Sequence, residues 1–420
     1  MPAHRRDFLR SSLAASTLVS MGATTVPAFL SRSAVAAGMP GSGSGGSDRV
    51  LVVVQLLGGN DGLNTVVPFG MDGYTKHRRT LRVPTPQIHK LSGDVGLHPA
   101  MGGMAKLVED GGLAVVQGVG YPNPDRSHFR SMEIWESAKL DPKALDTGWL
   151  GRALDASPAK AGDDVRAIHV GNRALPLAVK AKRTEVPSVA SLDQYRLQIP
   201  GSAADRRSGR DALDQLTRLE RKGDDPLLGF VRRSTLSAYA SSKRLETVAG
   251  AAKGGGSKYP NHGLARRLEL VAQVIKAGFG TRIFYTSLDG FDTHANQLGS
   301  HAALLTELSD SLAAFHKDLA GSGQADRVVV LSFSEFGRRA AENASLGTDH
   351  GAAAPVFISG PVARSGLVGA HPSLETLDDG DLIHHTDFRR VYAALLERWL
   401  GVAAEPVVGP GFPPLDLFRA

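Results

Sequence analysis

The sequence contains no cysteine among its 420 residues. Disulfide bonds, thiolate metal sites and cysteine nucleophiles are therefore excluded. A protein without such cross-links depends on its hydrophobic core for stability. The roughly 370 residues that follow residue 48 can build that core as one large domain, or as a domain with an insert.

A strong net charge is also missing. The formal charge is +6 at pH 7. About half of it belongs to the N-terminus, where Arg5, Arg6, Arg10 and Arg32 stand against Asp7, a difference of 4 − 1 = +3. The remaining charge is too mild to indicate binding to nucleic acid or to a membrane surface. We expect neither partner.

Long apolar runs of the membrane-spanning kind are absent as well. The segment over residues 13–30 is only weakly apolar and is rich in Ser, Thr, Gly and Ala. The more apolar run over residues 49–57 is too short to span a bilayer. We therefore expect no stable membrane anchor.

The N-terminus instead predicts an export signal. Arg5 and Arg6 stand just before Phe8-Leu9, and Ala34-Val35-Ala36 offers a small-residue cleavage site. This pattern predicts a twin-arginine signal peptide over residues 1–36, followed by a flexible Gly/Ser linker over residues 37–48. We expect a periplasmic or secreted protein whose export partner is the twin-arginine translocase. That pathway carries folded proteins, often with a cofactor already inserted.

The run over residues 49–57 is rich in Val and Leu and ends at Gly58-Gly59. Such a run is typical of a strand buried on both faces, in a parallel sheet covered by helices. Asp61 is the first charge after it, and ligands sit at the carboxyl ends of strands in open α/β sheets. Asn60-Asp61-Gly62 is equally consistent with a simple turn.

Further apolar strands alternate with helical patterns along the chain, which favours a mostly parallel sheet sandwiched between helices. The predicted strands cover residues 113–119, 165–171, 282–288, 327–333 and 355–359, and residues 175–181 are expected to pair beside the second of these. The predicted helices cover residues 101–109, 128–138, 302–319 and 388–400. A helical insert is predicted at about residues 205–278. The whole α/β domain would run from residue 49 to residue 420.

Polar clusters recur where these strands end. They are Asp61, then Ser127 with Arg126 and Arg130, then Asp289, Asp292 and His294, then Glu335, and finally Asp349 and His350. Because the ends of parallel strands share one edge, these residues are expected to converge. Carboxylates and imidazoles without thiols suit one or two divalent ions such as zinc or manganese. Ser127 is interpreted either as a helix N-cap or as a nucleophile, and the two arginines as an anion site.

The motifs LLGGNDGLNTVVP, NPDRSHF, SLDGFDTH, SEFGR and GTDHG, together with the twin-arginine start, resemble the family of domain of unknown function 1501. That family is grouped with the alkaline phosphatase and sulfatase superfamily, which implies an alkaline-phosphatase-like fold with metals at the strand ends. The resemblance implies that Asp61 is a metal ligand and that Ser127 is the nucleophile.

The same resemblance implies a ligand pair of Asp289 and His294, with Asp292 as a competing choice, and His350 as the last histidine ligand. Glu335 then falls where the superfamily has an Asp-His pair. A second alignment takes Asp349-His350 as that pair. In either case one metal site is altered.

Two functions follow from this resemblance. The first is an exported metal-dependent hydrolase of phosphate esters, or less readily of sulfate esters, because no C-x-P-x-R or S-x-P-x-R stretch exists for formylglycine formation. The second is a non-catalytic binding or assembly protein on the same fold. A third interpretation is that the strand-end cluster is structural and binds nothing.

Overall fold

The computed structural model describes residues 48–141, 146–156, 165–184, 186–190 and 258–418. The predicted signal peptide, most of the linker and most of the helical insert lie outside these residues. Within the described ranges, no helix is both long enough and apolar enough to cross a membrane.

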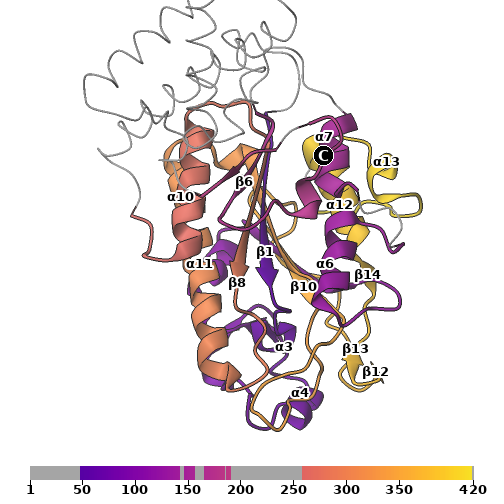
Figure 1. The fold of residues 1–420 in the computed structure, drawn as a ribbon. Coiled ribbons are helices and arrows are strands. Elements are labelled where there is room, and N and C mark those ends of the chain that lie inside the picture. The colour runs from indigo at the N-terminus through magenta and orange to yellow at the C-terminus, as the bar shows by residue number, and fades with distance from the viewer. Residues whose placement is uncertain (1–47, 142–145, 157–164, 185, 191–257, 419–420) are drawn as a thin grey trace, which may run out of the picture.

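A nine-stranded sheet forms the centre of the molecule (Figure 1), in the order β11-β5-β10-β9-β1-β8-β6-β7, with β14 beside the carboxyl end of β5. Its strands are β1 (Val50–Leu57), β5 (Leu113–Gly120), β6 (Ala167–Val170), β7 (Ser188–Val189), β8 (Ile283–Asp289), β9 (Val328–Ser334), β10 (Ala354–Ser359), β11 (Gly366–Val368) and β14 (Thr386–Asp387). All are parallel except β10, which is antiparallel to both of its neighbours. The predicted mostly parallel sheet is therefore confirmed.

The alternation of side chains along β1 explains why its sequence is apolar throughout. Val52 and Val54 face one hydrophobic core and Leu51 and Val53 face the other, all fully buried. A strand with a core on each side has no position for a polar residue facing water.

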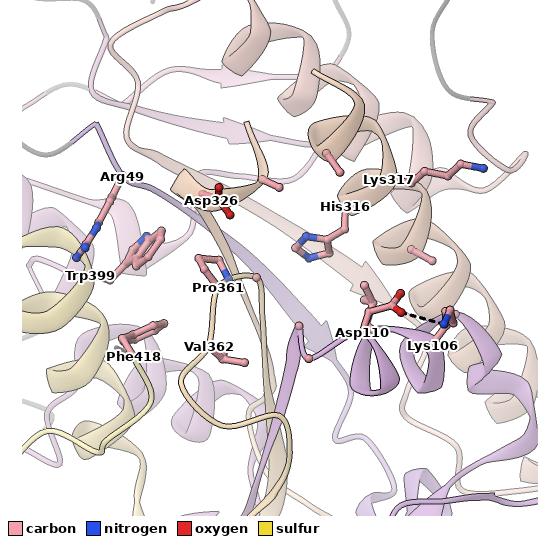
Figure 2. Close-up of a pocket in the computed structure, with 18 residues that line it drawn as sticks. Arg49, Lys106, Asp110, His316, Lys317, Asp326, Pro361, Val362, Trp399 and Phe418 are labelled. Carbon is pink, nitrogen blue, oxygen red and sulfur yellow. Dashed lines mark ion pairs between the residues drawn. The ribbon is translucent and has the colours of Figure 1, made fainter. Parts of the chain in front are cut away.

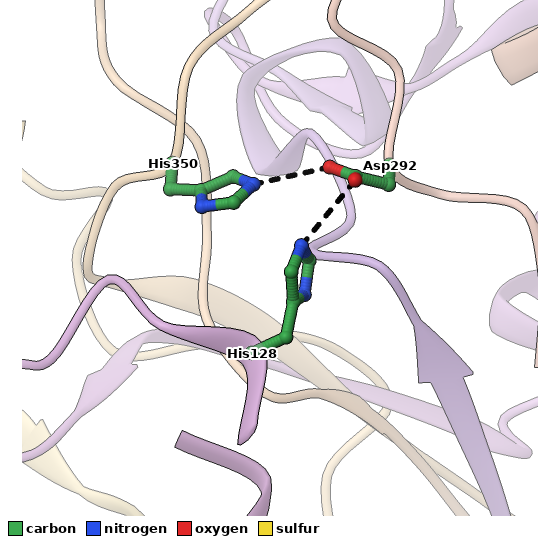
Figure 3. A group of neighbouring side chains, drawn as sticks. All are labelled: His128, Asp292 and His350. Carbon is green, nitrogen blue, oxygen red and sulfur yellow. Dashed lines mark hydrogen bonds and ion pairs between the residues drawn. The ribbon is translucent and has the colours of Figure 1, made fainter. Parts of the chain in front are cut away.

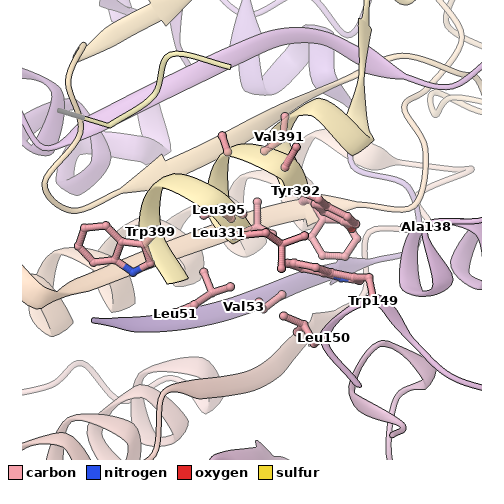
Figure 4. Packing of buried hydrophobic residues seen from close by; sticks show 14 of the residues in the cluster. Leu51, Val53, Ala138, Trp149, Leu150, Leu331, Val391, Tyr392, Leu395 and Trp399 are labelled. Atoms are coloured by element: carbon pink, nitrogen blue, oxygen red, sulfur yellow. The ribbon is translucent and has the colours of Figure 1, made fainter. Parts of the chain in front are cut away.

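Helices cover both faces of the sheet (Figure 1). One face packs against α5 (Gly102–Glu109), α10 (Gly263–Lys276) and α11 (Gln297–Gly321). The other packs against α6 (His128–Ser137), α7 (Trp149–Ala156), α12 (Phe388–Ala394), the π-helical turn Leu395–Leu400 and α13 (Glu405–Val408). Figure 4 shows this second core, where the Trp149 and Tyr392 rings stack with their centroids 4.0 Å apart.

Smaller elements lie mainly at the edge where β1 ends (Figure 1). They are α3 (Gly62–Thr65), α4 (Asp72–His77), a small antiparallel sheet of β2 (Val66–Val67), β4 (Gly96–Leu97) and β3 (His89–Lys90), and the hairpin of β12 (Leu377–Asp378) and β13 (Asp381–Leu382). Short 3-10 helices cover Thr85–Gln87, Pro99–Met101, Leu177–Val179 and Ala325–Arg327.

Two sequence expectations change. Residues 175–181 form a 3-10 turn and not a strand, because Pro176 fixes the backbone at its start; β7 pairs with β6 instead, with His169 opposite Ser188. The end of the predicted insert, α10, packs directly on the sheet against α11 and β8. The rest of that insert falls outside the described residues.

Candidate functional site

Three side chains from different parts of the chain meet at the carboxyl edge of the sheet (Figure 3). Asp292 follows β8, and His128 opens α6 after β5. His350 precedes β10, but β10 runs antiparallel, so its beginning lies at the edge where the other strands end. The antiparallel strand is therefore what brings His350 to the other two residues.

Asp292 is the centre of this group. Its Oδ1 lies 3.1 Å from His350 Nε2 and 2.9 Å from the Nε2 of a third histidine, His294. Its Oδ2 lies 3.4 Å from His128 Nε2, and the Nε2 atoms of His294 and His350 are 2.9 Å apart. A tetrahedron of ligands about 2.0 Å from a zinc ion has edges of about 3.3 Å. The spacing of these atoms is that of a metal-ligand set.

The other ring nitrogen of each histidine is held from outside the group. His350 Nδ1 donates to the Arg126 carbonyl at 2.8 Å. His128 Nδ1 lies 2.9 Å from Glu335 Oε1, which also accepts the Gly58 N–H. His294 Nδ1 lies 3.6 Å from Asp349. Outer partners of this kind fix the tautomer and orientation of metal-binding histidines.

This arrangement has a consequence for the inner nitrogens. Since a carbonyl can only accept, the Nδ1 of neutral His350 carries the proton and its Nε2 presents a lone pair to Asp292. His128 Nε2 is buried, has no hydrogen-bond partner among the described residues, and also faces the carboxylate. Lone pairs that face a carboxylate repel it unless a cation or protons lie between them. The donor set therefore fits a divalent metal ion.

The pKa values agree with such a site. Burial raises the pKa of Asp292, but hydrogen bonds from Arg338 and His350 outweigh it and lower this pKa to about 2. Burial lowers the pKa of His350, so its ring is neutral at pH 7. The hydrogen bond to Glu335 raises the pKa of His128.

Arg338 forms the floor beneath the carboxylate. Its fully buried guanidinium donates to Asp292 Oδ1 at 2.8 Å, to the Phe291 carbonyl at 2.9 Å and to the Gly58 carbonyl. It also donates to the carbonyls of Gly59 and Thr348. One cation therefore holds the ends of β1 and two site loops together, and its charge disfavours a second metal ion beside Asp292.

Two predicted ligands lie outside the group. Asp61 is fully buried, where Arg78 binds both of its carboxylate oxygens and Gln297 donates to Oδ2. Asp289 is exposed at the end of β8 and pairs with Arg173. Their oxygens are taken by arginines, so the structure assigns neither to the metal-ligand group.

The remaining predicted residues are arranged around the group. Ser127 is exposed and precedes α6, and within the described residues its hydroxyl makes no capping hydrogen bond. Arg126 is paired with Asp379 and Asp381, and Arg130 with Glu133. Asp349 and Glu335 contact histidines and not Asp292. Of the two choices after β8, the geometry favours Asp292.

His128 is the member of the group that the sequence interpretation missed. It stands next to Ser127 in the NPDRSHF motif, at the start of the helix that follows β5. Its place at a strand-to-helix junction was the available signal. Arg338, four residues after the end of β9, was missed for another reason, since nothing in the sequence indicates that an arginine is buried.

A larger cavity, of about 800 Å³, lies at the opposite edge of the sheet (Figure 2). Its lining includes Arg49 before β1, Asp326 before β9, and His316, Trp399 and Phe418. His316 is hydrogen-bonded to Ser359, and Lys106 to Asp110 closes an ion pair at the rim. We place the candidate site at the histidine group because its donor atoms converge, whereas those of the cavity are paired or scattered.

Solved structures that align with the chain include the zinc complex of the C-terminal periplasmic domain of EcEptC from Escherichia coli (TM-score 0.43, 11% identity, 90% of this chain and 92% of that one). Others are PsFucS1 sulfatase from Pseudoalteromonas sp. (0.41, 11%, 88% and 70%) and a protein in the alkaline phosphatase superfamily from Vibrio parahaemolyticus (0.37, 10%, 90% and 76%). Likeness at these scores is distant, and we take no function from it.

No curated protein matches the sequence. A family model does, over residues 48–397, and this range contains every residue of the histidine group. The family expected from the sequence motifs is thereby confirmed: the chain belongs to the family described as "Protein of unknown function (DUF1501)".

Proposed function

We propose that this protein is a metal-dependent hydrolase of phosphate esters, with sulfate esters as the less favoured substrates. Asp292, His128, His350 and His294 would hold one divalent ion, zinc or manganese. The observation that carries the proposal is the set of Nε2 and carboxylate oxygen atoms spaced 2.9–3.4 Å apart, with the outer nitrogens held by Glu335, Asp349 and the Arg126 carbonyl.

When bound, the ion would act as a Lewis acid that polarises an ester oxygen. The chain supplies the rest of the chemistry. Asp292 keeps a negative charge at neutral pH, and Arg338 holds that carboxylate in place. The side chain of Asp292 is 48% exposed, so the site is open to a substrate from solution.

Ser127 is the nucleophile of this proposal. It is exposed and adjacent to His128, and it stands before the first turn of α6, whose N–H groups lack partners within the helix. Those groups and the positive end of the helix dipole favour an anionic ester at the same place. The nucleophile and the anion would then meet beside the ligand group.

One ion is proposed and not two. The carboxylates that a second ion would need, Asp61 and Asp289, are paired with Arg78 and Arg173. Arg338 adds a buried positive charge against the ligand group. These three arginines oppose a second cation.

A binding or assembly protein is the second candidate, and one observation favours it. Arg126 and Arg130, the arginines expected to hold the anion, are occupied by Asp379, Asp381 and Glu133. A ligand-binding site without turnover needs the metal but not the nucleophile. The two candidates therefore differ in what Ser127 does.

We also propose that residues 1–36 direct export through the twin-arginine translocase to the periplasm or beyond. The Arg5-Arg6 pair and the site after Ala36 support this proposal. Replacing both arginines with lysine should leave the precursor uncleaved in the cytoplasm. Normal processing of that variant would refute the route.

The test of function compares the protein, purified without chelator, with four variants. We expect about one equivalent of zinc or manganese in wild type and in Asp289→Ala, and none in His128→Ala or His350→Ala. Aryl phosphate turnover should vanish in Ser127→Ala while its metal content stays. Metal without turnover in wild type would favour the binding protein, and no metal in any sample would refute both.

A further inference from the structure

We propose that Gln297, anchored by the buried Asp61–Arg78 ion pair, is a positioning residue that fixes the spacing of the two loops carrying Asp292, His294 and His350. This inference rests on the proposed function, in that the spacing it describes is the spacing of the metal ligands. It gives Asp61, the charge that ends the first strand motif, a role other than that of a ligand.

Gln297 is the first residue of α11 and is fully buried. Its Oε1 accepts two hydroxyl donors, Thr293 Oγ1 at 3.1 Å and Thr348 Oγ1 at 2.7 Å. Its Nε2 donates to Asp61 Oδ2. Because a carboxylate only accepts, the nitrogen of the amide must face Asp61, and its oxygen must then face the two threonines. The orientation of the amide is thereby determined.

The two threonines belong to the two ligand loops. Thr293 stands between Asp292 and His294, and Thr348 stands two residues before His350. The Thr348 N–H also donates to the Thr293 carbonyl at 3.3 Å. One amide oxygen therefore joins the loop after β8 to the loop before β10.

The packing between these loops leaves no space for a different spacing. A Cβ atom on Gly347 would lie 2.2 Å from the carbonyl carbon of His294. The loops therefore touch through backbone at Gly347 and are joined through side chains at Gln297. A change in the length or polarity of residue 297 must shift both loops, or separate them.

The ion pair is the anchor of Gln297. Arg78 binds Asp61 through both Nη atoms, at 2.5 and 2.9 Å, and both side chains are fully buried. Arg78 also donates to the carbonyls of Ala340 and Arg339, after β9. Asp61 is thus held from a third loop and cannot follow Gln297 if the amide moves.

The experiment measures the Co²⁺ dissociation constant, the visible spectrum of the cobalt protein and amide hydrogen exchange of the metal-free protein. Gln297→Met keeps the length of the side chain and removes its hydrogen bonds. We expect at least tenfold weaker Co²⁺ binding, the size usual for the loss of an outer-shell partner, and an altered spectrum. Exchange should rise together in residues 290–297 and 343–351.

His316→Met is the matched control, because it removes a buried hydrogen bond from the other end of α11, at the far edge of the sheet. It should lower stability without changing the cobalt constant more than twofold. Thr348→Val, which lacks the hydroxyl, should repeat the effect of Gln297→Met, and Thr348→Ser should restore wild-type binding. The threonine pair answers the question even if Gln297→Met does not fold.

Unchanged cobalt affinity in Gln297→Met and Thr348→Val, or an equal loss in His316→Met, would overturn the inference. If wild type binds no Co²⁺, Zn²⁺ or Mn²⁺, the proposed function fails and the exchange data judge the inference alone. A joint rise in both loops then supports it, and a rise in one loop or in neither overturns it.

Discussion

Replacing Arg78 with methionine should strongly destabilise the protein, because it leaves the Asp61 carboxylate buried without its cation. Both side chains are fully buried, and removing one member of such a pair costs about 3–5 kcal/mol. The Ala340 and Arg339 carbonyls lose their donor as well. We therefore expect the free energy of unfolding at pH 7 to fall by about 4 kcal/mol in urea titrations with chelator present.

The pH dependence tests the cause. In wild type, burial raises the pKa of Asp61, but the charge and hydrogen bonds of Arg78 lower it below the usual value overall. The ionised carboxylate therefore adds stability above its unfolded pKa of about 3.9, and this is lost as pH falls through the lowered folded pKa. Without Arg78, burial raises the folded pKa instead, so the penalty is largest at neutral pH and shrinks as Asp61 takes up a proton.

The control is Arg173→Met, which breaks the exposed pair with Asp289 and should cost less than about 1 kcal/mol. The difference between Arg78→Met and wild type should be several times larger at pH 7 than at pH 4. A loss no larger than that of Arg173→Met, or one that is the same at both pH values, would refute the reasoning.

Three further predictions follow from the site and the core. Glu335→Gln removes the hydrogen bond that raises the pKa of His128, so metal affinity should be about tenfold lower at pH 8 and its loss on acidification should move to lower pH; an unchanged midpoint in a pH series of metal titrations would contradict this. Gly58→Ala places a Cβ 2.3 Å from the Asp292 nitrogen at a φ of +118°, so it should weaken metal binding, whereas Gly111→Ala, at a φ of +80° in open space, should only reduce the free energy of unfolding; equal metal constants would exclude crowding of the loop. Trp149→Ala should cost about 3–5 kcal/mol in chemical unfolding because Trp149 is fully buried and stacks on Tyr392, and a loss below about 1 kcal/mol would show that this core collapses around the gap.

The sheet was largely predictable because its central strands are buried on both faces. Continuous apolar runs identified β1, β5, β8, β9 and β10 to within one or two residues. The direction of β10 was not predictable, since a run buried on both faces looks the same in either direction. Its short length and the polar loop before it carry no information on its partners.

The site was predicted in part. Asp292, His294 and His350 come together as strand-end residues should. Asp61 also follows a strand, but Arg78, from a segment that reads as polar and basic, turns inward and pairs with it. Sequence spacing places a residue at an edge of the sheet, and it does not say which opposite charge reaches that residue first.

The position of β1 has a consequence for how the chain folds. The central strand is made first, yet its two neighbours come from the last third of the chain: Leu51 pairs with Ile283, and Val50 with Val328. Until residue 334 has left the ribosome, the most apolar run of the domain has no strand beside it. Such distant pairing is slow and exposes apolar surface while it waits. Assembly of this domain is therefore a late, post-translational event that a chaperone must bridge, and the histidine group, which is complete only with residue 350, is among its last products.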